Sequence, residues 1–216
     1  MNTKILLILA GIACAVLLRK RIAADLVSFK TDRAQWMRNK WENWIKPLVI
    51  AGVLAIAIRT FLIGPYKIPT GSMRSVLIEG DRIFVDKITY RFREPERGDI
   101  IVFKYPLDRK KDFVKRLVAF GGENLEIRDG QIYVNGQRLE IPPSFAKRYY
   151  YNREDWSYGK RGQNFTVPPG QLFVLGDNSA QSSDSRNWGF ISRRDVVGRA
   201  ILIWWPPRRF RFLKNT

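Results

Sequence analysis

The fold class is indicated most directly by residues 125–139, which read Leu-Glu-Ile-Arg-Asp-Gly-Gln-Ile-Tyr-Val-Asn-Gly-Gln-Arg-Leu. Two dipeptides, Asp129-Gly130 and Asn135-Gly136, divide this stretch into short runs rich in apolar residues. Both central residues of a tight hairpin turn need a positive φ angle, which Asp, Asn and Gly adopt most readily. The stretch therefore predicts antiparallel strands joined by two tight turns.

Five further stretches have the composition of strands. Each is short, rich in Ile, Val, Phe or Tyr, and bounded by Gly, Pro or charged residues. They are residues 82–90, 99–105, 112–120, 171–175 and 199–205. Residues 144–165 contain three consecutive tyrosines and many charges, which predicts a long surface loop or an inserted hairpin. We therefore expect a mostly β domain over residues 65–216.

Two apolar runs precede this domain. The first, residues 5–18, has no charge, and the second, residues 48–63, is interrupted only by Arg59. Each is shorter than the ~20 residues with which a helix crosses a bilayer, but flanking residues extend them to residues 1–18 and 47–64. We expect a transmembrane helix at each of these positions. The alternatives are a cleavable signal peptide for the first run and a buried core helix for the second.

The segment between the two runs, residues 19–46, is strongly basic. It holds eight Lys or Arg and three Asp or Glu, a net charge of +5. Because basic loops remain on the cytoplasmic side, we expect a multi-pass protein of the cytoplasmic (inner) membrane with its β domain on the extracytoplasmic side. Apolar residues between Trp36 and Ile45 recur at helical spacing. They predict an amphipathic helix that lies either on the membrane surface or against the protein itself.

Composition excludes several classes of protein. The chain has no histidine, which excludes a Ser-His-Asp or Cys-His mechanism and every His-ligated metal site. The single cysteine, Cys14, excludes a disulfide framework and a Cys-rich zinc site. The net charge is +18, and residues 47–216 contribute 29 basic and 17 acidic side chains to it. No helix-turn-helix, RNP-like or zinc motif accompanies this charge, so we expect no nucleic acid partner.

Without histidine, an activated nucleophile needs another base. A lysine can serve where burial lowers its pKa enough to leave the amine neutral. Ser72 follows a turn shaped by proline and glycine. Lys115 lies on the same face of its expected strand as Phe113 and Leu117, since side chains alternate along a strand. The alternatives are a serine that only shapes a turn and a lysine that extends to solvent.

The sequence also contains five motifs in a fixed order. They are Ile68-Pro69-Thr70-Gly71-Ser72-Met73; Leu77 with Gly80-Asp81; Arg97-Gly98-Asp99-Ile100-Ile101-Val102-Phe103; Lys115-Arg116 with Gly121-Gly122-Glu123; and Gly176-Asp177-Asn178-Ser179 continuing to Ser182, Asp184-Ser185-Arg186 and Trp188-Gly189. This ordered set resembles bacterial signal peptidase I, and the resemblance extends from the apolar runs to Arg199. No single motif would be specific, but the order of all five is.

The resemblance implies a Ser-Lys mechanism. In that family the serine corresponding to Ser72 attacks the scissile carbonyl, and the lysine corresponding to Lys115 is the general base. The oxyanion hole would consist of the Ser72 N–H and the Thr70 hydroxyl. Ser182 would hold the lysine amine in place, with Ser183 as the second choice.

The resemblance also implies a role for further residues and a biological activity. Asp184 and Arg186 would support the site, while Ile68, Leu77 and Val114 would line a small apolar pocket for an Ala-x-Ala sequence. We expect a membrane-bound serine endopeptidase that cleaves signal peptides from exported preproteins. Its partners would be these preproteins and the phospholipid bilayer, close to the protein-export machinery. It would need neither a metal nor an organic cofactor.

Two positions depart from the family pattern. The position after Met73 usually leads into Pro-Thr-Leu, whereas residues 74–77 here are Arg-Ser-Val-Leu. Phe120 precedes the glycine pair where a Pro-Gly turn is usual. Loss of the proline leaves the backbone next to Ser72 less fixed, which concerns the rate and fine specificity. A relative dedicated to a special substrate, such as a pilin precursor, is therefore an alternative.

Two other functions agree with part of the sequence. A membrane-anchored binding protein would use a basic β domain to hold anionic lipid or polymer. That function leaves the motifs around Ser72 and Lys115 without explanation. A self-cleaving repressor would share the Ser-Lys chemistry, but it would have a DNA-binding domain where this chain has apolar runs.

Overall fold

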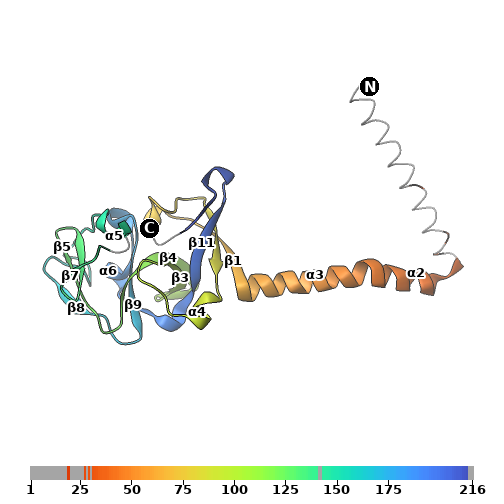
Figure 1. The fold of residues 1–216 in the computed structure, drawn as a ribbon, viewed down its shortest axis with the longest axis horizontal. Helices are drawn as coiled ribbons and strands as arrows, with labels where there is room; N and C mark the ends of the chain where they lie inside the picture. The colour runs from red at the N-terminus through yellow and green to blue at the C-terminus, as the bar shows by residue number, and fades with distance from the viewer. Residues whose placement is uncertain (1–18, 20–26, 28, 30, 141–142, 214–216) are drawn as a thin grey trace, which may run out of the picture. The chain divides into compact units, whose positions relative to one another are not determined.

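The computed structural model describes residues 19, 27, 29, 31–140 and 143–213 (Figure 1). The chain divides into two compact units, Met1–Ala57 and Ile58–Thr216. The transmembrane helix expected at residues 1–18 lies outside the described residues.

A long helix, Arg33–Leu62, precedes the β domain. It consists of α2 (Arg33–Lys40), η1 (Trp41–Ile45), α3 (Lys46–Ala57) and η2 (Ile58–Leu62), and the two η segments are wider, π-type turns. The Asp32 side chain caps its start by accepting a hydrogen bond from Gln35 N. None of its residues is buried. Within the described ranges it is the one helix long and apolar enough to cross a membrane.

The helix differs from the expected segments at both ends. Residues 33–46 of the predicted basic loop are helical, which includes the residues between Trp36 and Ile45 that are expected to form a helix. The predicted span 47–64 ends two residues early, because Ile63 and Gly64 already pair with the next strand. Where two transmembrane helices are predicted, the part of the chain that the structure describes contains one helix of sufficient length and apolarity.

The larger of two sheets has eight strands in the order β1-β2-β11-β3-β4-β9-β10, with β12 paired to β11. All its pairs are antiparallel. The strands are β1 (Ile63–Lys67), β2 (Arg82–Asp86), β3 (Ile100–Tyr105), β4 (Asp108–Phe120), β9 (Gln171–Leu175), β10 (Ile191–Ser192), β11 (Val196–Trp205) and β12 (Arg211–Phe212). β3 and β4 are therefore interior strands of the sheet, and the second half of β4, from Lys115 to Ala119, is buried.

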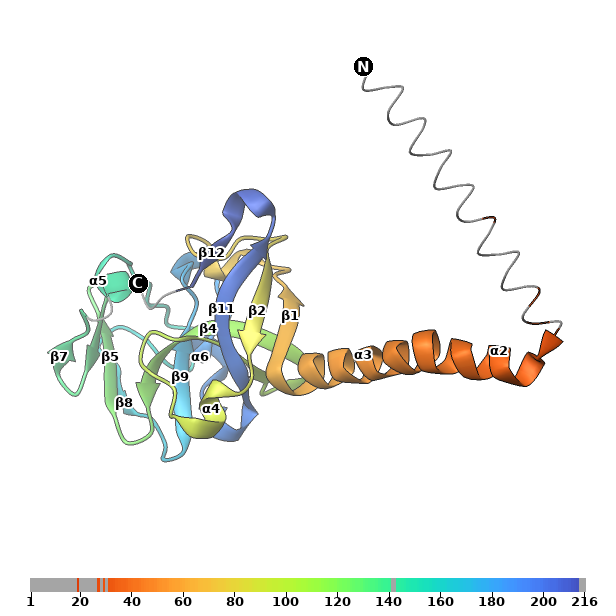
Figure 2. The ribbon, with the colours of Figure 1, turned by 45° about the vertical axis from the view of Figure 1, so that its right-hand side comes forward.

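The smaller sheet has four strands in the order β7-β6-β5-β8. They are β5 (Asn124–Arg128), β6 (Gln131–Val134), β7 (Gln137–Arg138) and β8 (Asn164–Thr166), and they lie beside β9, away from β1 (Figure 2). The φ angles at the two turns are 50° and 75° at Asp129 and Gly130, and 52° and 77° at Asn135 and Gly136. Both predicted hairpins are present, and the mostly β fold class is confirmed.

The connection over residues 144–165 is only partly a surface loop. Phe145 and Tyr150 are buried in the core that also contains side chains of β4 and β5. The connection begins within the short helix α5 (Pro143–Ala146) and ends in β8. Some of its aromatic side chains thus pack against the interior, whereas Tyr149 and Tyr151 are exposed.

The strand expected over residues 82–90 ends at Asp86. One oxygen of its carboxylate accepts hydrogen bonds from Ile88 N at 2.8 Å and Thr89 N at 3.0 Å. These bonds start a short helix, α4 (Thr89–Phe92). A local turn held by the Asp86 side chain therefore overrides the apolar composition that predicts a longer strand.

Candidate active site

Ser72 lies in a tight turn, η3 (Gly71–Met73), between β1 and β2. A hydrogen bond from Ile68 N to Asp81 O, at 2.8 Å, joins the two ends of the loop that contains this turn. Met73 is fully buried in the core of the larger sheet, whereas Ser72 is 8% exposed. Core packing of Met73 therefore determines where the neighbouring serine hydroxyl lies.

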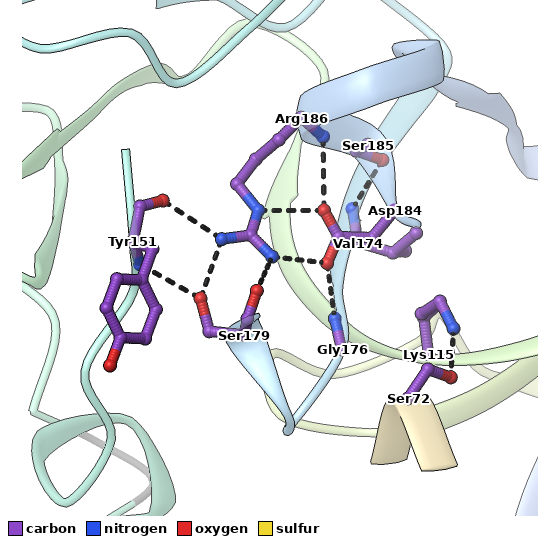
Figure 3. A network of polar contacts seen from close by, with 9 residues as sticks. All are labelled: Ser72, Lys115, Tyr151, Val174, Gly176, Ser179, Asp184, Ser185 and Arg186. Carbon is purple, nitrogen blue, oxygen red and sulfur yellow. Dashed lines mark hydrogen bonds and ion pairs between the residues drawn. The ribbon is translucent and has the colours of Figure 1, made fainter. Parts of the chain in front are cut away.

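Lys115 approaches Ser72 from the interior of the larger sheet. It lies on β4, opposite Ile101 of β3, and is 4% exposed. Its Nζ is 2.5 Å from Ser72 Oγ, and the two side chains point toward each other (Figure 3). Nζ also lies 5.7 Å from the ring centroid of Phe113, which agrees with the shared strand face expected from alternation. The structure thus brings together the serine and the lysine that the sequence analysis singled out.

Burial controls the charge of this lysine. It lowers the pKa of the Lys115 amine from 10.5 to about 8, because the ammonium ion loses its water. The negative charges of Asp184 and Asp177 oppose this shift, and the positive charge of Arg186 adds to it. A large fraction of the amine is therefore neutral in mildly alkaline solution and able to accept the proton of Ser72 Oγ.

A cavity of about 280 Å³ opens beside the two side chains. Ile68 and Val114 line it, as the sequence predicts, but Leu77 does not. Leu77 is fully buried in the core, because a 2.8 Å hydrogen bond from its N to Met73 O turns the chain back toward the interior. Lining residues that the sequence analysis did not assign to the pocket include Tyr66, Asp112, Phe113, Gln181 and Ser183.

Thr70 also lines this cavity, two residues before Ser72. Its backbone is extended, with φ −133° and ψ 157°, and its side chain is exposed. The hydroxyl does not cap the turn that follows. It therefore stays available to a molecule that enters the cavity.

The loop after β9 forms hydrogen bonds with the turn that contains Ser72. Asn178 N donates a hydrogen bond to Ser72 O at 3.0 Å, and Asn178 Nδ2 donates to Gly71 O at 3.0 Å. Gly176 is so close that an added Cβ would lie 2.6 Å from Ser72 O and would collide with Ser182 Oγ. Glycine at this position is therefore a steric requirement of the site.

Comparison with known proteins identifies the family. A family model described as signal peptidase, peptidase S26, matches residues 41–205. The chain belongs to the signal peptidase I family. It is 38% identical over 183 residues to a probable signal peptidase I-2 of Synechocystis sp., which covers 82% of this chain and 79% of that protein. It is 37% identical over 173 residues to signal peptidase I of Leptolyngbya laminosa, which covers 76% and 80% of the two chains.

A third relative is signal peptidase I P of Bacillus subtilis subsp. natto. It is 32% identical over 186 residues, which cover 85% of this chain and 99% of that protein. The residues matched by the family model, 41–205, include both the turn of Ser72 and the strand of Lys115. The chain is accordingly a serine endopeptidase with signal peptidase I activity.

In this signal peptidase I, Ser182 lies beside Gly176, which also approaches the backbone of Ser72. Its side chain packs beside Gly176 and is 8% exposed. Among the residues that the structure describes, its hydroxyl has no hydrogen-bond partner. Ser183 instead lines the cavity. The orienting role of Ser182 toward the Lys115 amine therefore stays a prediction.

A buried ion pair between Asp184 and Arg186 stabilises the loop after β9, next to the site (Figure 3). Arg186 Nε and Nη2 donate to the two carboxylate oxygens of Asp184 at 2.9 and 2.8 Å, and both side chains are fully buried. Asp184 also accepts a bond from Gly176 N at 3.0 Å. Arg186 donates further to Ser179 Oγ at 2.6 Å and to Tyr151 O at 3.0 Å. This geometry agrees with the structural role that the resemblance implies for both residues.

A second buried pair adjoins the site. Arg116, the neighbour of Lys115, donates through Nε and Nη2 to Asp177 at 2.8 and 2.7 Å. Arg148 adds a bond to Asp177 at 3.1 Å. Nothing local in the sequence indicates the contact with Arg148, which comes from the long connection. Within the described ranges, no group of three or more His, Cys, Asp or Glu side chains could hold a metal ion.

The loop after Ser72, which departs from the family pattern, is held by a segment near residue 210. Ser75 has a φ of 87°, a strained value for a residue other than glycine. The next carbonyl, Val76 O, accepts hydrogen bonds from Arg209 Nη2 at 3.2 Å and Arg211 Nη2 at 2.7 Å. Arg209 also forms two bonds, of 2.8 and 3.0 Å, with the Asp81 carboxylate. These contacts hold a backbone that lacks the usual proline.

Proposed function

We propose that this chain is a membrane-bound signal peptidase in which Ser72 is the nucleophile and Lys115 the general base. The observation that carries this proposal is the 2.5 Å separation between Lys115 Nζ and Ser72 Oγ. Burial lowers the pKa of this lysine to about 8. In a chain without histidine, a neutral amine in contact with the hydroxyl supplies the base that a serine nucleophile needs.

The reaction would proceed through an acyl-enzyme. Neutral Lys115 takes the proton of Ser72 Oγ as the oxygen attacks the scissile carbonyl carbon, and a tetrahedral oxyanion forms. The peptide C–N bond then breaks, and the new ammonium of Lys115 returns the proton to the departing amine. A water molecule, deprotonated by Lys115, attacks the ester and releases the signal peptide with a free carboxylate. Ser72 recovers its proton in this step.

The negative charge of the tetrahedral intermediate would be stabilised by two donors, the Ser72 N–H and the Thr70 hydroxyl. Thr70 lines the cavity next to Ser72, and its hydroxyl does not bond to the turn. A donor aimed at the developing oxyanion acts mainly in the transition state, so its benefit appears in kcat.

The substrate would present small side chains to the cavity. Ile68, Phe113 and Val114 provide its apolar wall, and its volume is about 280 Å³. An apolar wall of this kind suits the apolar methyl side chains of an Ala-x-Ala sequence. Gln181 and Ser183 at its edge would face the substrate backbone.

Membrane attachment would place this cavity close to the bilayer. The helix Arg33–Leu62 is long and apolar enough to cross, and β1 begins at Ile63, the residue after it. With the basic segment 19–46 on the cytoplasmic side, as the positive-inside rule favours, the β domain would lie on the extracytoplasmic side. Exported preproteins expose their cleavage sites on that side.

Cleavage of a defined preprotein tests the function. Purified full chain should cut a preprotein after the second alanine of its Ala-x-Ala sequence, and sequencing of the product's new N-terminus should show this position. A matched preprotein with phenylalanine in place of that alanine should remain uncut. Cleavage at other positions, or equal cleavage of both preproteins, would contradict the proposed specificity.

The pH dependence of cleavage should report the base. Because the amine must be neutral, kcat/KM should rise as pH rises through about 8, the pKa of Lys115. Below this midpoint the neutral fraction, and the rate with it, should fall by roughly tenfold per pH unit. The measurement is kcat/KM against pH, with circular dichroism to show that the fold persists. A profile that stays flat to about pH 5 would instead indicate a carboxylate base.

Removal of the Thr70 hydroxyl should slow the chemical step. Thr70→Val keeps the shape of the side chain but loses a donor to the oxyanion, so kcat should fall by about 10²–10³ with KM nearly unchanged. Steady-state kinetics on a peptide substrate measures both constants. The control is Thr166→Val, an exposed threonine on β8, which should leave kcat unchanged. A higher KM with unchanged kcat would assign Thr70 to substrate binding alone.

A further inference from the structure

A second cavity, of about 430 Å³, lies next to the last turn of the long helix. Four basic side chains line it, and no carboxylate is among its lining residues. These four are Lys87, Arg91, Lys104 and Arg193. It shares only Tyr66 with the cavity beside Ser72. Such a concentration of positive charge at a cavity favours an anionic ligand.

Two of these four charges are already neutralised by neighbouring carboxylates. Lys104 Nζ is 2.7 Å from Asp112, and Arg193 Nε is 2.8 Å from Glu94. The other two, Lys87 and Arg91, form no ion pair within the described residues. The cavity therefore carries about two uncompensated positive charges, which matches a group with one or two negative charges.

Lys87 is oriented by the end of the helix. Its Nζ donates to the carbonyl oxygens of Arg59 at 3.4 Å and Thr60 at 3.2 Å, and Thr60 itself lines the cavity. Both carbonyls belong to η2, the last turn before β1. An ammonium at this position stabilises the negative end of the helix dipole. It still has one N–H free to donate to a ligand, since an ammonium has three.

The surroundings of Arg91 suit the boundary between headgroups and acyl chains. Arg91 lies on α4 and is exposed, and its neighbour Phe92 is 85% exposed. An exposed aromatic ring beside basic side chains is typical of surfaces that insert into the membrane interface. Here these residues lie in one unit with Thr60, which belongs to the end of the helix expected to cross the bilayer.

We propose that this cavity binds the phosphate group of an anionic phospholipid headgroup, with Lys87 and Arg91 as the main contacts. Basic pockets next to membrane helices are suited to such headgroups, because attraction to the phosphate adds to burial of the acyl chains. Inorganic phosphate shares the charge but lacks the chains. The inference rests on the proposed membrane attachment, since lipid reaches the cavity only if the helix lies in a bilayer.

Lipid retention by the full chain tests the site. The purified protein in neutral detergent is mixed with phosphatidylglycerol or with phosphatidylcholine of the same chains, and native mass spectrometry measures the lipid that stays bound. We expect preferential retention of phosphatidylglycerol. Lys87→Gln with Arg91→Gln should weaken it by about thirtyfold, and Arg91→Gln alone by about fivefold, because each basic side chain near an anionic lipid surface contributes comparably. The single variant removes no intramolecular bond, so it keeps the fold.

The control variant is Lys147→Gln with Arg161→Gln, which removes two charges from the connection before β8, away from this cavity. It should retain phosphatidylglycerol like the wild type. Equal losses in both double variants, equal retention of the two lipids, or displacement of lipid by millimolar inorganic phosphate would overturn the proposal. Alkaline extraction of cell membranes tests attachment separately, so a failure there is distinguishable from a failure of the site.

Discussion

Lys115→Ala is expected to lower the cleavage rate by at least about 10⁴-fold while the protein stays folded. The substitution removes the base that lies 2.5 Å from Ser72 Oγ. It also removes an amine whose burial is unfavourable in the charged form, so the free energy of unfolding should change little. Ser72→Ala should have an effect of the same size. Single-turnover cleavage of a preprotein by the purified variants measures both.

The double variant distinguishes a catalytic pair from two independent residues. If Ser72 and Lys115 act as one unit, the double variant should be no slower than either single variant. Lys147→Ala, at an exposed lysine of the long connection, is the matched control and should cleave at the wild-type rate. Turnover near the wild-type rate by Lys115→Ala would show that another group is the base.

Asp184→Asn should strongly destabilise the fold. The asparagine has nearly the same shape, but it leaves the fully buried guanidinium of Arg186 without its carboxylate. Breaking a buried ion pair in this way costs about 3–5 kcal/mol. For a domain of this size, the corresponding fall in Tm is roughly 10 °C. Thermal unfolding of the full chain in detergent, followed by circular dichroism, measures it.

An exposed ion pair provides the control for Asp184→Asn. Asp155 pairs with Arg153 at 2.9 Å, but their side chains are 63% and 59% exposed. Such pairs contribute about 0–1 kcal/mol, so Asp155→Asn should leave Tm almost unchanged. If the two variants lost the same stability, the buried pair would not be the support that the geometry indicates.

Features with a local cause could be predicted from the sequence. The hairpins around Asp129 and Asn135 follow from turn residues that adopt positive φ whatever surrounds them. The site was predictable for a different reason. Ser72 and Lys115 belong to short ordered motifs, and strand alternation indicated the apolar face on which Lys115 lies.

Features that depend on distant contacts could not be predicted in this way. Leu77 reads like a pocket residue, but a turn that bonds back to Met73 places it in the core. Tyr150 lies in a charged segment that reads as surface, yet the hydrophobic core accepts its ring. Ile63 reads as the end of an apolar helix, and only pairing with β2 makes it the start of a strand.

The contacts from Arg209 and Arg211 to Val76 O also bear on when the loop beside Ser72 becomes fixed during synthesis of the chain. They join positions 133 and 135 residues apart in the chain. Because synthesis proceeds from the N-terminus and folding accompanies it, a nascent chain that ends before residue 209 already carries Ser72 and Lys115. It still lacks the hydrogen bonds that hold the strained loop beside them. The loop beside Ser72 would thus be fixed only late in synthesis, once residues 209–211 have been added.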